Sequence, residues 1–287
     1  MRKIQMWPFK RSPIVPVIQL SGTVGMVTPL RPGLSISSLA EPLEKAFEMS
    51  KAPSIAIIVN SPGGSAVQSS LILKRIRALA EENEKKIYVF CEDVVASGGY
   101  YIALAGDEIY AEPSSIIGSI GVISSGFGFN KAIEKLGIER RIYTAGRSKS
   151  ILDPFLPEKA EDVERLADLQ RDAHDVFISV VKERRAEKLK GADTELFSGA
   201  FWSGRKALDL GLIDGISDVR TKMREIHGEN VRLKVVPLER GGFLSRLKRI
   251  PSFEEFIQNK ITHEHSSLSD ELISSLERRA LWSKYGL

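Results

Sequence analysis

A serine stands where an apolar run ends, in the stretch VVASGGYYIA at residues 94–103. Ser97 follows a segment with strand character and precedes two glycines and a second apolar segment, so the pattern predicts strand, turn, serine and helix in that order. The start of a helix favours negative charge and glycines leave room for a substrate backbone, which suits a nucleophilic serine. The alternative is a serine that caps the helix, and this stretch alone favours the cap.

A second glycine-rich strand end, NSPGG at residues 60–64, could supply the electrostatic part of such a site. Pro62 fixes one backbone angle, and the glycines adopt conformations closed to other residues, so backbone N–H groups can face outward. Donors held in this way stabilise a developing oxyanion. Because Ser-Pro-Gly-Gly is also a good turn, the motif alone does not decide between the two interpretations.

A serine nucleophile needs a base, and no histidine precedes Ser97 or lies within the 76 residues after it. A Ser–His–Asp arrangement of the Clp type is therefore unsupported, and His174 is better explained as a surface or hydrogen-bonded residue of a helix. Lysine is the alternative base where its surroundings keep it neutral. Most lysines lie in charged helical stretches, but Lys149 lies in the loop TAGRSKSILDPF among small polar residues. Lys149 is thus the candidate base.

The distribution of charge and the absence of other motifs argue against nucleic-acid binding, metal sites and cofactor sites. Residues 1–40 hold five of the 41 basic residues and none of the 37 acidic ones, so the basic character belongs to an N-terminal leader and predicts no nucleic-acid partner. There is no P-loop, Cys-x-x-Cys or His-Glu-x-x-His, and we expect no metal and no cofactor. Two S-x-x-K matches, at 203–206 and 245–248, lack the companion motifs of penicillin-binding enzymes.

Short β-branched runs alternate with helical patterns from about residue 14 to 238, which predicts repeated βαβ units in one α/β domain. We predict strands at 14–20, 54–60, 86–92, 107–111, 121–124 and 140–145, and helices at 34–49, 66–82, 129–136 and 157–188. Residues 1–13 form the basic leader. Residues 239–287 hold two short amphipathic stretches and are interpreted as a helical C-terminal tail, either for docking or for an oligomer contact.

Several of these segments together resemble the signal peptide peptidase A family of Ser–Lys peptidases. The likeness runs from about residue 14 to 238 in a common order. Its motifs are NSPGG (60–64), ASGGYYIA (96–103), IGSIGVI (117–123), AGRSKSILDP (145–154) and FWSGRKALDLGLID (201–214). The resemblance implies a fold of the Clp-protease and crotonase-like α/β class, a spiral of βαβ units.

The resemblance also implies roles for single residues. Ser97 matches the nucleophile, Lys149 the general base, and Ser119 the serine that orients the lysine. Gly64 matches a glycine whose backbone N–H contributes to the oxyanion hole, and Gly98 is assigned to the same hole. The implied reaction is hydrolysis of peptides through an acyl-enzyme, with extended hydrophobic or small-residue peptides, such as cleaved signal peptides and membrane-derived fragments, as substrates.

Members of this family assemble so that the serine and the lysine of one site come from neighbouring subunits or repeats, which predicts a homo-oligomer. They commonly carry a transmembrane anchor, whereas residues 1–13 are a basic, aromatic leader able to contact a membrane surface. With the single cysteine, Cys91, this leads us to expect a cytoplasmic protein peripheral to the inner membrane. Two rivals stay open: a crotonase-like acyl-CoA enzyme, and an inactive peptide-binding scaffold.

Overall fold

An eight-stranded, mostly parallel sheet forms the centre of the computed structural model, which describes residues 12–25, 33–146, 148–238 and 282–285. The strands are β1 (Ile14–Ser21), β2 (Ser54–Ser61), β3 (Lys86–Ala96), β4 (Glu108–Ala111), β5 (Ile116–Gly118), β6 (Phe201–Ser203), β7 (Gly215–Ile216) and β8 (Arg232–Val235). The helices are α1 (Ile36–Glu48), α2 (Ala66–Glu82), α3 (Gly98–Ala103), α4 (Asn130–Lys135), α5 (Ala160–Arg185), α6 (Asp193–Leu196), α7 (Gly204–Asp209) and α8 (Val219–His227), with a 3₁₀ turn η1 (Ala186–Lys188). The mixed α/β class is confirmed.

The strand order is β6-β5-β3-β2-β1-β8, and only the β5–β6 pair is antiparallel. Strand β3 changes its partner along its length. Its first half pairs with β4, which also pairs with β7, and its second half pairs with β5. The sheet therefore divides at the middle of β3, a few residues before Ser97.

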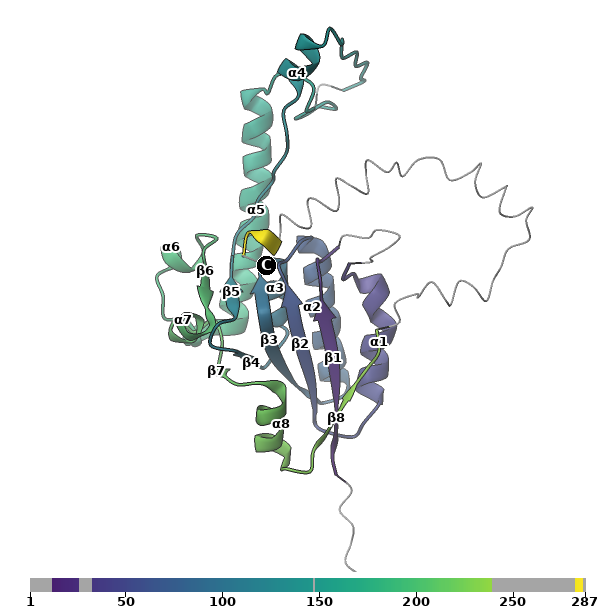
Figure 1. Cartoon of the computed structure of the whole chain (residues 1–287), viewed down its shortest axis with the longest axis vertical. Coiled ribbons are helices and arrows are strands. Elements are labelled where there is room, and N and C mark those ends of the chain that lie inside the picture. Colours follow the sequence, from purple (N-terminus) through teal and green to yellow (C-terminus); the bar gives the residue numbers. More distant parts are fainter. Residues whose placement is uncertain (1–11, 26–32, 147, 239–281, 286–287) are drawn as a thin grey trace, which may run out of the picture.

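Apolar side chains are buried on both faces of the central strands, as expected for a covered parallel sheet. One face packs against α1, α2 and α3 in the larger core, which includes Ile57, Val89, Leu43 and Ile76. The other face forms a smaller core around Phe90 and the Met223 side chain of α8. Figure 1 shows α1 and α2 beside the strands and α8 near their amino-terminal ends.

An arm formed by residues 121–159 leaves this body next to α5. The C-terminal part of α5 is anchored, since Phe177 and Val181 are buried and the Phe177 ring lies 4.9 Å from that of Tyr101 in α3. At 1.5 Å per residue, the start of α5 lies about 25 Å from Phe177 along the helix. Helix α4, in the middle of the arm, lies near that start and away from the sheet (Figure 1).

The predicted strands at 121–124 and 140–145 are wrong, because both segments are irregular parts of this arm. Their β-branched and aromatic residues are exposed, with Tyr143 91% and Ile123 78% accessible. A strand needs a neighbouring backbone to accept and donate its hydrogen bonds, and none runs beside these segments in the described chain.

The other predicted elements agree with the structure within a few residues, the helix at 66–82 without any shift. The strands β5, β6, β7 and β8 and the helices α6 and α8 were missed. Each missed strand has two to four residues, too few for an alternating pattern to stand out. The leader at 1–13 and the tail at 239–287 lie almost wholly outside the described residues. No described helix is long and apolar enough to cross a membrane.

A buried ion pair fixes the end of α5 to the sheet. Arg185 is 2% exposed and donates to the Gly211 carbonyl and to both carboxylate oxygens of Asp214, at 2.7 and 3.2 Å. The Lys188 ammonium also donates to the Asp214 carboxylate, and so does the Ile109 N–H. Partial burial acts to raise the pKa of Asp214, but the hydrogen bonds from Arg185 and Lys188 hold it below its ordinary value.

We expect Asp214→Asn to lower the free energy of unfolding by about 3 kcal/mol, because it leaves the Arg185 charge buried and unbalanced. The pKa of Asp214 is depressed in the folded state, so its contribution is complete above about pH 4 and is lost as the pH falls further. Urea unfolding from pH 3 to 7 measures both effects. The exposed pair of Asp168 with Arg171 gives the control, Asp168→Asn, which should change stability by less than about 1 kcal/mol. An equal change in both variants would contradict the prediction.

Candidate active site

Ser97 lies at the junction between β3 and α3 with a strained backbone. Its φ is +51° and its ψ is −124°, a region that residues with a Cβ rarely adopt. The Ser97 N–H donates to the Gly118 carbonyl at 2.8 Å, and its own carbonyl accepts from Tyr101. Both strand ends and the first turn of the helix therefore hold this conformation in place.

The hydroxyl of Ser97 is not used as a helix cap. Ser97 occupies the N-cap position of α3, but its side chain makes no capping hydrogen bond and has no other hydrogen-bond partner among the described residues. The side chain is half-buried. A serine at a strained turn with an unengaged hydroxyl has the properties of a nucleophile more than those of a cap.

The NSPGG turn lies directly against Ser97. A Cβ added to Gly63 would fall 2.8 Å from the Ser97 Cβ and 2.8 Å from the Gly98 nitrogen. Gly64 has a φ of +140°, and a Cβ there would lie 2.2 Å from the Val24 carbonyl oxygen. These two positions require glycine, both for their backbone angles and for the close approach of neighbouring backbone.

Two backbone N–H groups near Ser97 have no acceptor among the described residues, those of Gly64 and Gly98. The Val24 N–H donates to the Gly63 carbonyl at 2.8 Å, and the Val24 carbonyl accepts from the Ser65 N–H at 2.9 Å. In an extended segment successive N–H groups point to opposite sides, so the Gly64 N–H faces away from Val24. The Gly64 nitrogen lies 3.2 Å from where a Cβ of Gly98 would be. This arrangement has the donors that an oxyanion hole requires.

Ser119 lies at the end of β5, beside the same junction. It is 6% exposed, has a φ of +54°, and its N–H donates to the Ala200 carbonyl at 2.7 Å. The phenol of Tyr285 faces the Ser119 side chain, and its ring packs against Phe201 with centroids 5.1 Å apart. Burial raises the pKa of Tyr285, and the Ser119 hydroxyl opposes that rise. This neighbour of Ser119 had no signal in the sequence, because Tyr285 follows Ser119 by 166 positions.

Lys149 lies on the arm and makes no contact with Ser97, Ser119 or Gly64. Its side chain is exposed, and its N–H donates to the Gly146 carbonyl at 3.4 Å in a turn. The structure of one chain therefore brings together Ser97, Gly64, Gly98 and Ser119 and leaves Lys149 apart. The arm is held internally, since Arg140 pairs with Asp153 at 3.0 Å and Phe129 packs on Phe155.

The described histidines are engaged elsewhere. The Nε2–H of His174 donates to the Ile120 carbonyl at 3.1 Å, in agreement with a hydrogen-bonded helix residue. His227 lies at the opposite end of the sheet, 2.7 Å from the Ser54 hydroxyl, and burial lowers its pKa. Neither contacts Ser97.

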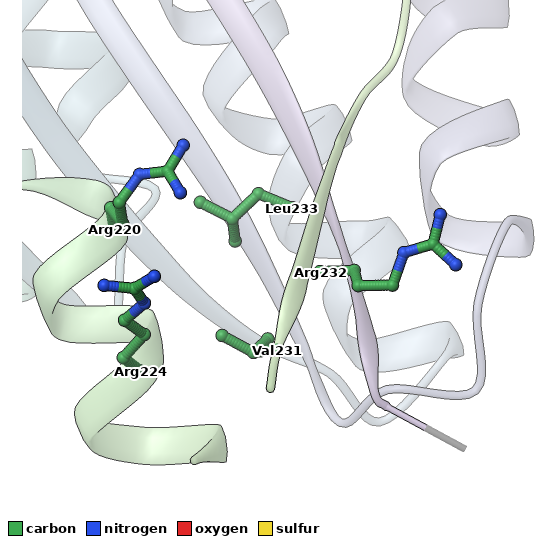
Figure 2. A pocket seen from close by; sticks show the side chains of 5 residues that line it. All are labelled: Arg220, Arg224, Val231, Arg232 and Leu233. Carbon is green, nitrogen blue, oxygen red and sulfur yellow. The ribbon is translucent and has the colours of Figure 1, made fainter. Parts of the chain in front are cut away.

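A hollow between α8 and β8 is separate from this site. It is lined by Arg220, Arg224, Val231, Arg232 and Leu233. Figure 2 shows the Arg220 and Arg224 side chains near Leu233, while the Arg232 side chain extends to the other side of β8. Strand β8 pairs with the first residues of β1, so this hollow lies at the amino-terminal end of the sheet, away from Ser97.

The geometry defines a class of site: a serine and paired backbone donors at the carboxyl ends of parallel strands. Comparison with known proteins identifies the family. The family model described as Peptidase family S49 matches residues 80–231. The chain belongs to peptidase family S49, and the resemblance to the signal peptide peptidase A family is confirmed.

Relatives differ in length and name. Proteins of Brucella abortus and Brucella melitensis named Na(+)/H(+) antiporter NhaA are 52% identical over 274 residues, which is 95% of this chain and 37% of theirs. The Arabidopsis thaliana protein named Serine protease SPPA, chloroplastic, is 33% identical over 210 residues, 70% of this chain and 30% of its own. Protease 4 of Haemophilus influenzae is 29% identical over 180 residues, 62% of this chain and 29% of its own. The chain thus spans less than two fifths of each of these relatives.

Proposed function

We propose that this protein is a serine endopeptidase that hydrolyses hydrophobic or small-residue peptides through an acyl-enzyme on Ser97. One observation carries the proposal: the unengaged hydroxyl of Ser97 projects from a strained junction beside the unpaired N–H groups of Gly64 and Gly98. A peptide carbonyl placed there would meet a nucleophile and two donors for the negative charge that develops on its oxygen.

Lys149 is the proposed general base. In its neutral form it takes the proton of Ser97 as the hydroxyl attacks the carbonyl carbon. The resulting ammonium gives this proton to the leaving amine, and water, deprotonated in turn by Lys149, hydrolyses the acyl-enzyme. Ser119 is proposed to hold the flexible lysine side chain by a hydrogen bond, which reduces the entropy lost when it is oriented.

The proposed enzyme is a homo-oligomer whose sites are each completed by a lysine from another subunit. Two observations support this arrangement. Lys149 belongs to the arm, whose helix α4 lies far from the sheet (Figure 1). The arm and the adjoining part of α5 expose large apolar side chains, among them Phe127, Leu136 and Tyr143 at 77, 73 and 91%. Exposed apolar surface of this extent is typical of a surface that binds another protein.

We further propose a Clp-protease-like spiral fold and membrane-derived substrates, including signal-peptide-like ones. The family and the mostly parallel sheet support the fold. The leader at 1–13 holds four basic residues, Arg2, Lys3, Lys10 and Arg11, and no acid, which favours contact with an anionic membrane surface. We therefore propose a cytoplasmic location peripheral to the inner membrane. The Brucella relatives, whose name is that of an antiporter, support a place near a membrane.

The test is hydrolysis of defined peptides by the purified full chain. Synthetic signal peptides, polar peptides of equal length, and an acyl-CoA series are incubated with the protein, and the products are identified by mass spectrometry. We expect internal cleavage of the apolar peptides and a lower rate with the polar ones. Turnover of acyl-CoA without peptide cleavage would favour the crotonase-like rival, and binding without any turnover would favour the scaffold.

The contact of Tyr285 with Ser119 leads to a prediction about activity. If Ser119 must bind Lys149, the phenol competes for its hydroxyl, and one neutral hydrogen bond is equivalent to about a fivefold effect. Tyr285→Phe, which keeps the ring on Phe201 and removes the hydroxyl, should raise kcat about fivefold. Tyr143→Phe on the exposed arm is the control. An unchanged or lower kcat in Tyr285→Phe would contradict this role of the phenol.

A further inference from the structure

The pairing between β2 and β3 is interrupted just before the candidate site. The strands are in register up to Val59 opposite Cys91, and then Ser61 lies opposite Val95. Residues 92–94 of β3 therefore lie opposite the single residue Asn60. A bulge of this kind bends the strand and leaves backbone groups without ladder partners. The bulge lies where the pairing of β3 with β4 ends and its pairing with β5 begins. The backbone hydrogen bonds between strands therefore hold β3 only weakly at this point.

The side chain of Asn60 connects the two sides of this bulge. Its Nδ2 donates to the Asp93 carboxylate at 2.7 Å, and its Oδ1 accepts from the Val94 N–H at 3.3 Å. The Asn60 carbonyl accepts from the Gly22 N–H at 2.9 Å, which ties the same residue to the end of β1. Asp93 needs a donor and Val94 needs an acceptor, and an amide is the short side chain that provides both.

The bulge controls how the nucleophile meets the oxyanion donors. Ser61 follows Asn60, is fully buried, and its hydroxyl accepts from the Gly63 N–H at 3.2 Å. Gly63 in turn contacts Ser97, which directly follows the strand that contains the bulge. A slip of β3 against β2 at Asn60 would therefore move Ser97 past Gly63 and Gly64. Displacements of about 1 Å can reduce a catalytic rate about 10²-fold.

We propose that Asn60 is a positioning residue, whose amide locks the bulge of β3 and so sets Ser97 against the Gly64 N–H. The inference rests on the proposed peptidase function. The local charges make the amide hard to replace: Glu92 and Asp93 are adjacent carboxylates without a salt bridge in the described chain, and the Asn60 side chain lies near Glu92 as well. A carboxylate at position 60 would repel both and would remove the donor.

The experiment exchanges the two partners. Asn60→Asp should lower kcat about 10- to 100-fold with KM changed less than about threefold, because the donors and the nucleophile are misplaced while the rest of the surface beside Ser97 is unchanged. In the double variant Asn60→Asp with Asp93→Asn, the new carboxylate accepts from Val94 and from the new amide. This exchange should restore kcat to within about threefold of the wild type. Asp93→Asn alone should have a small effect.

Asn83→Asp is the matched control. The Asn83 amide donates to the Leu79 carbonyl at the end of α2, away from the bulge, so its kcat should not change. If Asn60→Asp does not fold, Asn60→Ser, which adds no charge and cannot bridge both groups, should show the loss of kcat. Wild-type kcat in the Asn60 variants, or no recovery in a folded double variant, would overturn the proposal.

A second readout does not depend on turnover. The backbone amide resonances of Gly64 and Gly98 in ¹H–¹⁵N spectra should shift in Asn60→Asp and return toward wild-type positions in the double variant. If the wild type cleaves no peptide, the proposed function fails, and these spectra still decide the role of Asn60. Amide positions that are unchanged in Asn60→Asp would refute it.

Discussion

The Ser97→Ala variant is expected to fold and assemble like the wild type and to lose at least about 10³-fold in kcat for peptide cleavage. The hydroxyl has no hydrogen-bond partner among the described residues, so its removal breaks no structural contact. The strained φ of +51° is unchanged in alanine, which also has a Cβ. Loss of the nucleophile removes the acyl-enzyme path and leaves only the residual effect of the oxyanion donors.

The measurement is kcat on the best apolar peptide, with thermal unfolding and light scattering to verify fold and assembly. Ser179→Ala is a matched control, because the Ser179 hydroxyl is exposed on α5 and bonds only to the Asp175 carbonyl of its own helix. Retention of more than about a tenth of the activity in Ser97→Ala would exclude Ser97 as the nucleophile. Acyl-CoA turnover that survives the substitution would move the protein to the crotonase-like class.

The Lys149→Ala variant should also lose at least about 10³-fold in kcat while it keeps its fold, because an exposed arm residue supports no packing. The informative result comes from mixtures. When Ser97→Ala and Lys149→Ala subunits exchange, some sites combine an intact Ser97 with an intact Lys149 of another subunit. Such mixtures should regain measurable activity although each parent is inactive.

The controls for this experiment are the exchange itself and a second lysine. Subunit exchange is followed by mass-labelled protein in native mass spectrometry. Lys131→Ala, on α4 of the same arm, should keep wild-type kcat. Proven exchange without recovered activity would show that serine and base belong to one chain, which would require the arm to fold back toward its own sheet. Full activity in Lys149→Ala would eliminate the Ser–Lys assignment.

Short-range patterns in the sequence predicted most of the central fold. The helix at 66–82 was placed without error for two reasons. Its apolar residues keep helical spacing over many residues, and Ser65 caps its start by accepting a hydrogen bond from the Gln68 N–H. The strands at 14–20 and 54–60 are long apolar runs that are buried on both faces. The run at 140–145 has the same residue types and forms no strand, because β propensity has no effect without a partner strand.

The candidate site divides in the same way. The amino-acid sequence by itself determined the nucleophile candidate, the NSPGG turn and the family, because glycine requirements and ordered motifs are written in adjacent residues. It did not decide whether Ser97 is a helix cap or a nucleophile.

Only the tertiary structure showed that the Ser97 hydroxyl makes no capping hydrogen bond, that Gly63 contacts Ser97, and that Asn60 bridges the bulge of β3. The last two are contacts between residues more than 30 positions apart, set by strand register and packing, and no local pattern encodes a register shift. The separation of Lys149 from the other site residues is likewise a property of the tertiary structure, because Lys149 belongs to an arm that runs beside α5 and ends far from the sheet (Figure 1).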